Sequence, residues 1–356
     1  EGSVRFHCST RAVRVTIVLA AGRQAEMAAG RTQWLSLALA ASLATLLSAG
    51  AAQPPGIGFG YYRTTCPGAE RIVFSETTRI VRRSPDLAAS LLRLHYHDCF
   101  VQGCDASVLL DPTDGAPAEK DAKPNESLRG FDAVARVKDK LEKACPATVS
   151  CADVLALMAR DAVVLSKGPS WPVALGRRDG RTSSAGDCGQ LPPLYGNITA
   201  LIEVFAGKGL DVKDLVVLSA AHTLGKAHCS SFVDRLYNGT ACSTDPTLDR
   251  RYADRLRMRC RGPGDSSAEM AEMDVGSCST FDTSYYRQVA KGRALLRSDA
   301  GLMEHPVTAA YVRRAATGRY DGHFFRDFRD SMAKMGAMGV LTGDQGEIRT
   351  KCNLVN

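Results

Sequence analysis

The sequence of 356 residues has no long run of lysine or arginine, no internal repeat, and no low-complexity linker after Pro55. The first absence argues against a nucleic-acid-binding surface, and the others argue against a repeat array or loosely joined domains. Alternating apolar and polar residues, the pattern of half-buried strands, are scarce. Because 45% of the residues are hydrophobic and 23% are charged, the chain is not globally disordered. We therefore predict one globular, all-α domain with long loops.

The first 52 residues differ from the rest of the chain. Met27 is followed by one basic residue, Arg31, by an apolar run at 34–47, and by small residues at 48–52. This layout is typical of a secretory signal, and the apolar run is shorter than the roughly 20 residues that span a membrane. We expect three parts: an over-extended upstream segment at 1–26, a signal peptide at 27–52, and a mature domain at 53–356. The mature protein should be secreted, with no membrane segment.

Charge and cysteine content fit a secreted protein. Residues 1–52 carry five arginines and two glutamates, a net charge of +3, so the remainder holds +4 of the total +7. Mild basicity suits contact with an acidic polysaccharide better than contact with nucleic acid. Apart from Cys8, the remaining eleven of the 12 cysteines lie after residue 52. That density predicts a disulfide framework, and the odd number leaves at least one cysteine free or paired with another molecule.

Apolar residues at helical spacing predict helices at 84–99, 131–143 and 151–164. The first should begin with Ser84 as its N-cap and Pro85 in its first turn. A further helix should begin at Asp211 and stop at Gly225.

The most informative run covers residues 91–107. Arg93 and His97 are four residues apart and share one helix face, where they could stabilise an anion and move a proton. Asp98, Asp105 and Ser107 follow as oxygen donors around a turn, which suits Ca²⁺.

Two cysteines in the same run allow two interpretations. Cys99 and Cys104 are near enough to close the turn with a disulfide. Together with His95 and His97 they could instead bind zinc, although two histidines two residues apart diverge on a helix.

This run is similar to the distal motif of plant class III secretory peroxidases, and the similarity continues along nearly the whole mature chain. The further similar stretches are Glu119-Lys120, Pro124-Asn125, and residues 150–153, 175–179, 218–225, 281–286 and 297–299. The resemblance implies the haem peroxidase fold, with few or no short strands and one haem b between a distal and a proximal helix. It also implies a monomer that reduces hydrogen peroxide to water and oxidises phenolic donors by one-electron steps through a ferryl intermediate (EC 1.11.1.7). Such enzymes act in the apoplast or cell wall, where they take part in cell-wall and lignin oxidation and in the response to oxidative stress.

The resemblance also assigns roles to single residues. His222 corresponds to the axial ligand of the haem iron, and Asp299 to the carboxylate that accepts its other ring proton. His97 corresponds to the distal base, and Asn125 to the residue that fixes its tautomer. Arg93 would stabilise charge as the O–O bond breaks.

Two calcium ions are implied, one beside each histidine. The distal ion would bind Asp98, Asp105, Ser107 and the carbonyls of Val101 and Gly103, with Glu119 in support. The proximal ion would bind Thr223, Asp274, Ser277, Asp282 and the carbonyl of Thr280.

Eight cysteines match the family's four bridges, which are Cys66–Cys145, Cys99–Cys104, Cys151–Cys352 and Cys229–Cys260. The pairing of Cys188, Cys242 and Cys278 stays open.

Pro192 resembles the proline whose carbonyl contacts aromatic donors at the haem edge. Tyr96 departs from the family, which usually has Phe there, and adds an oxidisable hydroxyl to the pocket.

Asn197 and Asn238 begin glycosylation sequons, whereas Asn125, which also fits the pattern, should stay unmodified because its assigned role needs a buried, free amide. The main competing hypothesis is a secreted, calcium- and disulfide-stabilised wall-binding protein that has lost turnover.

Overall fold

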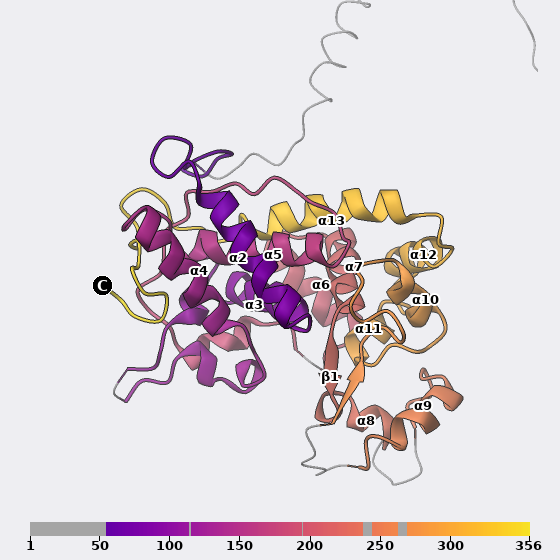
Figure 1. Ribbon diagram of the computed structural model, residues 1–356. Helices are drawn as coiled ribbons and strands as arrows, with labels where there is room; N and C mark the ends of the chain where they lie inside the picture. The colour runs from indigo at the N-terminus through magenta and orange to yellow at the C-terminus, as the bar shows by residue number, and fades with distance from the viewer. Residues whose placement is uncertain (1–54, 114, 194, 238–243, 263–268) are drawn as a thin grey trace, which may run out of the picture. The chain divides into compact units, whose positions relative to one another are not determined.

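Helices dominate the computed structural model, which describes residues 55–113, 115–193, 195–237, 244–262 and 269–356 (Figure 1). The α-helices are α2 Ala69–Arg83, α3 Leu87–Val101, α4 Phe131–Ala144, α5 Cys151–Leu165, α6 Ile198–Gly207, α7 Val212–Ser219, α8 Val233–Leu236, α9 Arg250–Arg257, α10 Ser284–Ala290, α11 Arg297–Gly301, α12 Pro306–Ala315 and α13 Asp321–Met335. Two short strands, β1 Lys226–His228 and β2 Met270–Glu272, pair antiparallel. The predicted all-α fold with few short strands is therefore confirmed. The predicted upstream segment and signal peptide, Cys242 and the sequon at Asn238 lie outside the described residues.

Short 3₁₀ segments join the helices and carry much of the site. They are Ser107–Leu109, Glu119–Asp121, Lys123–Asn125, Ala185–Gln190, Ala220–Thr223 and Cys229–Ser231.

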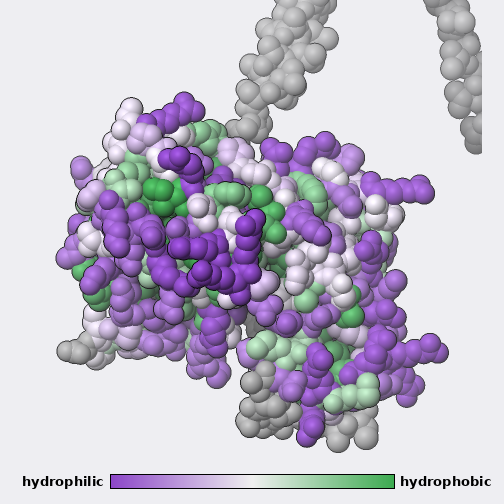
Figure 2. Space-filling model, in the orientation of Figure 1, coloured by the Kyte–Doolittle hydropathy of each residue, from purple (hydrophilic) through white to green (hydrophobic). Residues whose placement is uncertain are grey.

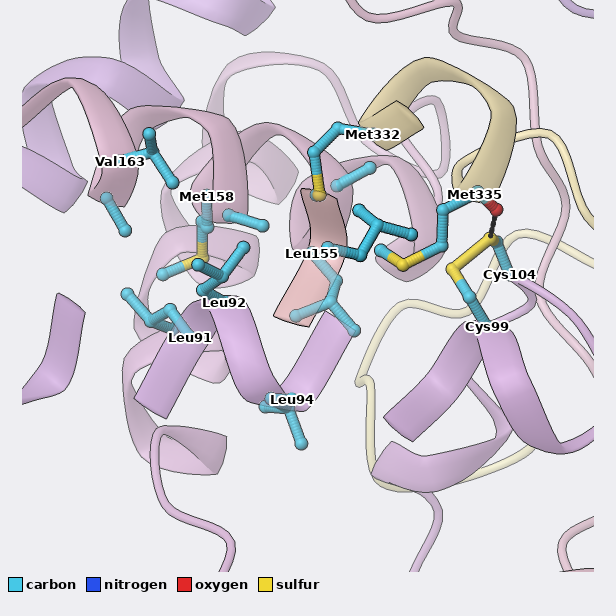
Figure 3. Packing of buried hydrophobic residues seen from close by; sticks show 14 of the residues in the cluster. Leu91, Leu92, Leu94, Cys99, Cys104, Leu155, Met158, Val163, Met332 and Met335 are labelled. Carbon is cyan, nitrogen blue, oxygen red and sulfur yellow. Dashed lines mark hydrogen bonds between the residues drawn. A yellow bond between two sulfur atoms is a disulfide. The ribbon is translucent and has the colours of Figure 1, made fainter. Parts of the chain in front are cut away.

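Helix α5 is the centre of the first group of helices and packs against α2, α3 and α4. It begins where the side chain of Ser150 accepts a hydrogen bond from the amide of Asp153, 3.1 Å away. Because α5 is apolar on nearly every side, it is almost wholly buried. Figure 3 shows Leu91 and Leu92 of α3 beside Met158 of α5, and Leu155 of α5 beside methionines of α13. The core fixes α3, the helix that carries Arg93 and His97.

The start of α3 differs from the prediction. The N-cap is Asp86 and not Ser84, and no side chain caps the helix. Ser84 instead ends α2, with its amide bonded to the carbonyl of Ile80. Pro85 disfavours helical backbone at the residue before it, so Ser84 is forced out of the helical region and a turn follows.

The proximal helix is shorter than predicted. Asp211 caps the helix as predicted, and Asp214 completes a reciprocal cap with it, at distances of 2.8 and 3.0 Å. Helix α7 ends at Ser219, and the chain tightens into the 3₁₀ turn Ala220–Thr223 before it reaches Gly225. Gly225 has φ +89°, and a Cβ there would lie 2.7 Å from the side chain of Ala89 on α3. A glycine therefore lets the proximal loop approach the distal helix closely.

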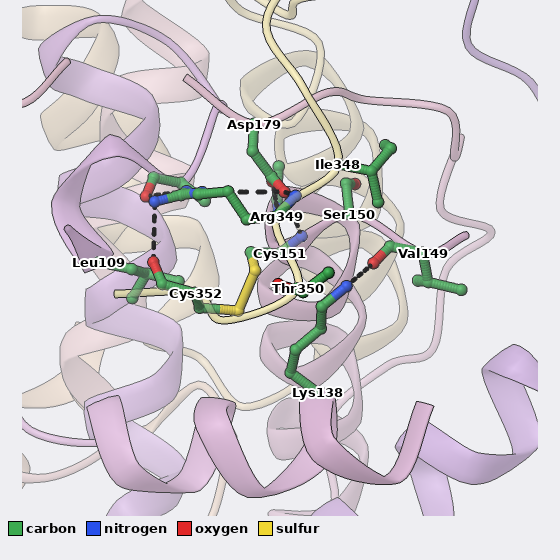
Figure 4. Close-up of a disulfide and its surroundings, with 12 residues drawn as sticks. Leu109, Lys138, Val149, Ser150, Cys151, Asp179, Ile348, Arg349, Thr350 and Cys352 are labelled. Atoms are coloured by element: carbon green, nitrogen blue, oxygen red, sulfur yellow. Dashed lines mark hydrogen bonds and ion pairs between the residues drawn. A yellow bond between two sulfur atoms is a disulfide. The ribbon is translucent and has the colours of Figure 1, made fainter. Parts of the chain in front are cut away.

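The structure contains all four predicted disulfides, with sequence separations from 5 to 201 residues. Cys151–Cys352 ties the C-terminal segment to the start of α5 (Figure 4). Beside it, the Asp179 carboxylate accepts hydrogen bonds from the amides of Cys151 and Ala152 at 3.0 and 2.8 Å. An anion at a helix N-terminus is favourable, and each disulfide typically contributes about 2–4 kcal/mol.

A second, smaller core lies under α8, α9 and the two strands, and is closed by Cys229–Cys260. In the part of the chain that the structure describes, no helix combines the length and apolar character required to cross a membrane.

Candidate active site

The distal residues meet as one hydrogen-bonded group. On α3, Nε of Arg93 donates to Nε2 of His97 across 3.2 Å. The other ring nitrogen of His97, Nδ1, lies 2.6 Å from the side-chain oxygen of Asn125. Because an amide oxygen can only accept, Nδ1 carries the proton and Nε2 carries the lone pair. The two contacts together select the neutral tautomer in which Nε2 is the basic atom.

Both partners of His97 are held in turn. Arg93 also donates to Ser127 Oγ at 2.9 Å and to the carbonyl of Pro124 at 3.0 Å. The amide nitrogen of Asn125 donates to the carbonyl of Glu119 at 2.8 Å and lies 3.4 Å from Sγ of Cys188. These bonds leave the side-chain oxygen of Asn125 pointing at the imidazole.

His97 is available as a base because its imidazole stays neutral at ordinary pH. Burial, followed by the positive charge of Arg93, lowers its pKa to about 3, although the bond to Asn125 acts in the opposite direction. A neutral imidazole at ordinary pH can take a proton.

On the proximal side, Nδ1 of His222 lies 2.9 Å from Oδ1 of Asp299. Loss of solvent lowers the pKa of His222, but the Asp299 carboxylate outweighs that effect and leaves the pKa raised. The His222 side chain is 38% exposed, whereas Asp299 behind it is 2% exposed. Nε2 of His222 makes no hydrogen bond to the described residues, because the ring bonds Asp299 through Nδ1.

These residues fit a haem. An imidazole that is oriented by a carboxylate and keeps a free Nε2 is the usual arrangement for an iron ligand. The positive charge of Arg93 opposes, without reversing, the rise that Asp299 causes in the His222 pKa.

The predicted distal calcium residues hold buried oxygen atoms with no hydrogen-bond partner in the described structure. They are Oδ1 of Asp98, Oγ of Ser107 and both carboxylate oxygens of Glu119. Burial, then Asp105 and Glu119, raise the pKa of Asp98, and burial raises that of Glu119 to about 7. Buried, unpaired carboxylates are costly unless a cation is bound, and their oxygen chemistry suits Ca²⁺.

The two predicted carbonyl ligands already accept hydrogen bonds. The carbonyl of Val101 accepts from Nζ of Lys208 at 3.1 Å, and that of Gly103 accepts from the amide of Asp105 at 2.8 Å. A carbonyl oxygen has two lone pairs, so each can still face an ion. Gly103 has φ +134°, and a Cβ there would lie 2.4 Å from the carbonyl oxygen of Gly339.

The proximal calcium residues also come together. Oγ1 of Thr223 donates to Asp274 at 3.1 Å and to the carbonyl of Thr280 at 3.3 Å. Ser277 Oγ donates to Asp282 at 2.7 Å. Oδ1 of Asp274 is buried without a partner among the described residues, and burial raises the pKa of this carboxyl group. The donor set again fits a hard cation.

Comparison with known proteins agrees with this geometry. The family model described as peroxidase matches residues 73–318. Peroxidase 1 of Oryza sativa subsp. japonica is 56% identical, over 88% of this chain and 98% of its own length. Peroxidase 39 and Peroxidase 3 of Arabidopsis thaliana are 50% and 49% identical, each over 83% of this chain and over 92% and 91% of their own lengths.

The chain belongs to the plant class III peroxidases. It is an enzyme with peroxidase activity, from a family whose members use haem and usually calcium and are secreted.

The zinc interpretation does not fit this peroxidase. Cys99 and Cys104 are joined in a disulfide, although His95 lies 3.6 Å from Sγ of Cys99. Disulfide sulfurs are not the thiolates that zinc requires, and His97 is engaged with Arg93 and Asn125.

Tyr96 and Pro192, the other two predicted site residues, make no hydrogen bond to the catalytic group among the described residues. The ring of Tyr96 packs edge-on against His97 at 5.3 Å and against Phe100 at 4.6 Å. Pro192 is partly buried and follows the 3₁₀ segment Ala185–Gln190, whose Cys188 touches Asn125. Donor contact at Pro192 stays a prediction.

Several residues of the peroxidase site were not assigned from sequence, among them Ser127, which accepts from Arg93. Cys188 accepts from the amide of Asn125, and Lys208 donates to the carbonyl of Val101. Ser284 donates to Asp274, and Tyr285 donates to Asp299. Ser284 and Tyr285 lie in the family-like stretch 281–286, but nothing in that stretch marks their partners.

Proposed function

We propose that this peroxidase oxidises small phenolic donors with hydrogen peroxide outside the cell, as a monomer. Each peroxide takes one electron and one proton from each of two phenols, which gives two waters and two phenoxyl radicals. The observation that supports this most is the fixed tautomer of His97, with Arg93 on Nε2 and Asn125 on Nδ1. Roles in wall and lignin oxidation and in oxidative stress follow from such products.

His97 moves the proton that breaks the peroxide. Its Nε2 takes the proton from one peroxide oxygen and returns it to the other, which leaves as water. Asn125 keeps the Nδ1 proton in place throughout, so the ring cannot change tautomer. Arg93 stabilises the negative charge that develops on the leaving oxygen. Each role typically contributes a factor of about 10²–10⁴ in rate.

One haem b would be held by Nε2 of His222, and it supplies the iron that binds peroxide and stores oxidising equivalents when bound. Asp299 holds the Nδ1 proton of His222 and makes the imidazole a stronger electron donor. Two calcium ions would occupy the distal and proximal oxygen clusters. Because Asp98 adjoins His97 and Thr223 adjoins His222, these ions would keep both imidazoles in position.

We also propose an acidic wall polysaccharide as a partner, bound by α9. Residues 249–261 contain six arginines and two aspartates, a net charge of +4 that equals the net charge of residues 53–356. Arg250, Arg251 and Arg255 are exposed and form no ion pair with another described residue. In the lower right of Figure 2, where α9 lies, hydrophilic side chains stand beside small apolar patches. Retention on a polygalacturonate column, released by salt, checks this partner.

The test of the main function uses the absorption spectrum and guaiacol turnover. The secreted protein should show a Soret band that shifts with peroxide, and it should oxidise guaiacol. His97→Leu should keep the Soret band but react with peroxide at least about 10²-fold more slowly. His323→Leu, which removes an exposed histidine, is the matched control. Haem without turnover in the wild type would instead favour the non-catalytic wall-binding protein.

A further inference from the structure

A single oxygen of Asp299 accepts two hydrogen bonds. The hydroxyl of Tyr285 donates to Oδ1 at 2.7 Å, and Nδ1 of His222 donates to the same atom at 2.9 Å. Tyr285 and Asp299 are each 1% exposed, so water does not compete for this oxygen. The two donors therefore share the charge of one buried carboxylate oxygen.

We propose that Tyr285 is a positioning residue that limits how strongly Asp299 accepts the His222 proton, and thereby sets the electron donation of His222 to iron. A second donor shares the charge of this oxygen and makes it a weaker acceptor toward Nδ1 of His222. A weaker acceptor draws the Nδ1 proton less strongly and leaves the imidazole less anionic. The inference rests on the proposed function, because it requires His222 to bind the haem iron.

The hydroxyl can be separated from the packing of the ring. The ring of Tyr285 contacts His222 edge-on at 6.4 Å and packs against Tyr286 at 5.2 Å. A phenylalanine preserves these contacts and removes only the bond to Asp299. Tyr286 supplies a matched control, since its buried hydroxyl donates to the backbone carbonyl of Val216 at 3.1 Å and does not touch Asp299.

The experiment compares haem-loaded Tyr285→Phe, Tyr286→Phe and wild type. The measurements are the ferric/ferrous reduction potential and the iron–imidazole stretching frequency in the resonance Raman spectrum of the ferrous protein. With one donor left, Asp299 should accept more strongly from His222 and make the imidazole more anionic. Tyr285→Phe should therefore lower the reduction potential and raise the stretching frequency, while Tyr286→Phe leaves both at wild-type values.

The other outcomes are decisive as well. The proposed role of Tyr285 would be wrong if Tyr285→Phe and Tyr286→Phe had equal potentials and frequencies. It would also be wrong if Tyr285→Phe raised the potential and lowered the frequency. Neither result would affect the ligand role of His222. A wild-type protein with haem but no iron–imidazole band would overturn the ligand role of His222, and the inference with it.

A second variant covers the case in which Tyr285→Phe does not retain haem. Fluorotyrosine at position 285 preserves the ring and makes the hydroxyl a stronger donor. It should raise the potential and lower the stretching frequency, and no shift would overturn the proposal. In Asp299→Asn the effect of the residue at 285 should largely vanish, because the shared carboxylate is gone.

Discussion

Nε of Arg93 donates a hydrogen bond to Nε2 of His97, the same nitrogen that must take a proton from peroxide. Arg93 therefore has two effects on one atom. It stabilises the charge that forms as peroxide breaks, and after burial it is the second cause of the low His97 pKa of about 3. The wild-type base should stay neutral, and the peroxide reaction should stay independent of pH, from about pH 4 upward.

Replacing Arg93 should move the acid limb of this pH profile. In Arg93→Leu the positive charge is gone, so the His97 pKa rises toward its ordinary value and the base is protonated at higher pH. The pH at which the peroxide reaction reaches half its maximal rate should be higher than in the wild type. The maximal rate itself should fall by a factor of about 10². Stopped-flow rates with peroxide between pH 3 and 7 measure both effects.

Arg129→Leu is the control, because Arg129 donates to the carbonyls of Glu126 and Leu128 and is not among the causes that lower the His97 pKa. It should leave the acid limb where it is. An acid limb in Arg93→Leu that coincides with that of the wild type would show that burial alone lowers the His97 pKa.

Calcium removal should make folding stability depend on pH. In the ion-free fold, burial and neighbouring carboxylates raise the pKa values of Asp98 and Glu119, the latter to about 7. Their unfolded values are about 3.9 and 4.3, so the folded chain binds more protons in this window. Stability of the calcium-free protein should therefore fall as pH rises from about 4 to 7. Thermal unfolding with and without calcium measures it, and the calcium-loaded protein should show little of this loss.

Glu119→Gln tests the source of that slope. It removes one carboxylate with a raised pKa, so the calcium-free variant should lose less stability between pH 4 and 7. Glu304→Gln, at an exposed glutamate, should keep the wild-type slope. If the melting temperature of the calcium-free wild type did not fall between pH 4 and 7, the predicted effect of the buried carboxylates on stability would be wrong.

Much of the site could be predicted because its chemistry is contiguous in sequence. Arg93, His97 and Asp98 lie within six residues of one helix, and Thr223 directly follows His222. The start of α3 was mispredicted because Ser84 and Asp86 both precede apolar residues. The capping preferences of single residues do not show that the amide of Ser84 is already bonded to the carbonyl of Ile80 at the end of α2.

The residues that were missed act over longer separations. Cys188 lies 63 residues from Asn125, and Tyr285 lies 14 residues from Asp299. No helical or strand period connects such pairs, so only tertiary packing brings them together. Tyr285 and Tyr286 stand side by side in sequence, yet they donate to a carboxylate and to a backbone carbonyl. The partner of each hydroxyl depends on how α10 is rotated against its neighbours.

The two free cysteines in the described part of the chain should differ in reactivity. Cys188 is 5% exposed, and burial, followed by Glu119 and Asp187, raises its pKa to about 11. Cys278 is partly exposed in the proximal loop, although burial raises its pKa as well. The thiolate is the reactive form and must be reached by the reagent. Iodoacetamide at pH 8 should therefore modify Cys278 first and leave Cys188 unmodified until the protein unfolds, as peptide mapping by mass spectrometry would show. Cys278→Ser should abolish the early modification at this site. Early modification of Cys188 in the native protein would instead mean that the segment beside Asn125 opens readily. Asn125 would then be held less firmly than its contacts indicate.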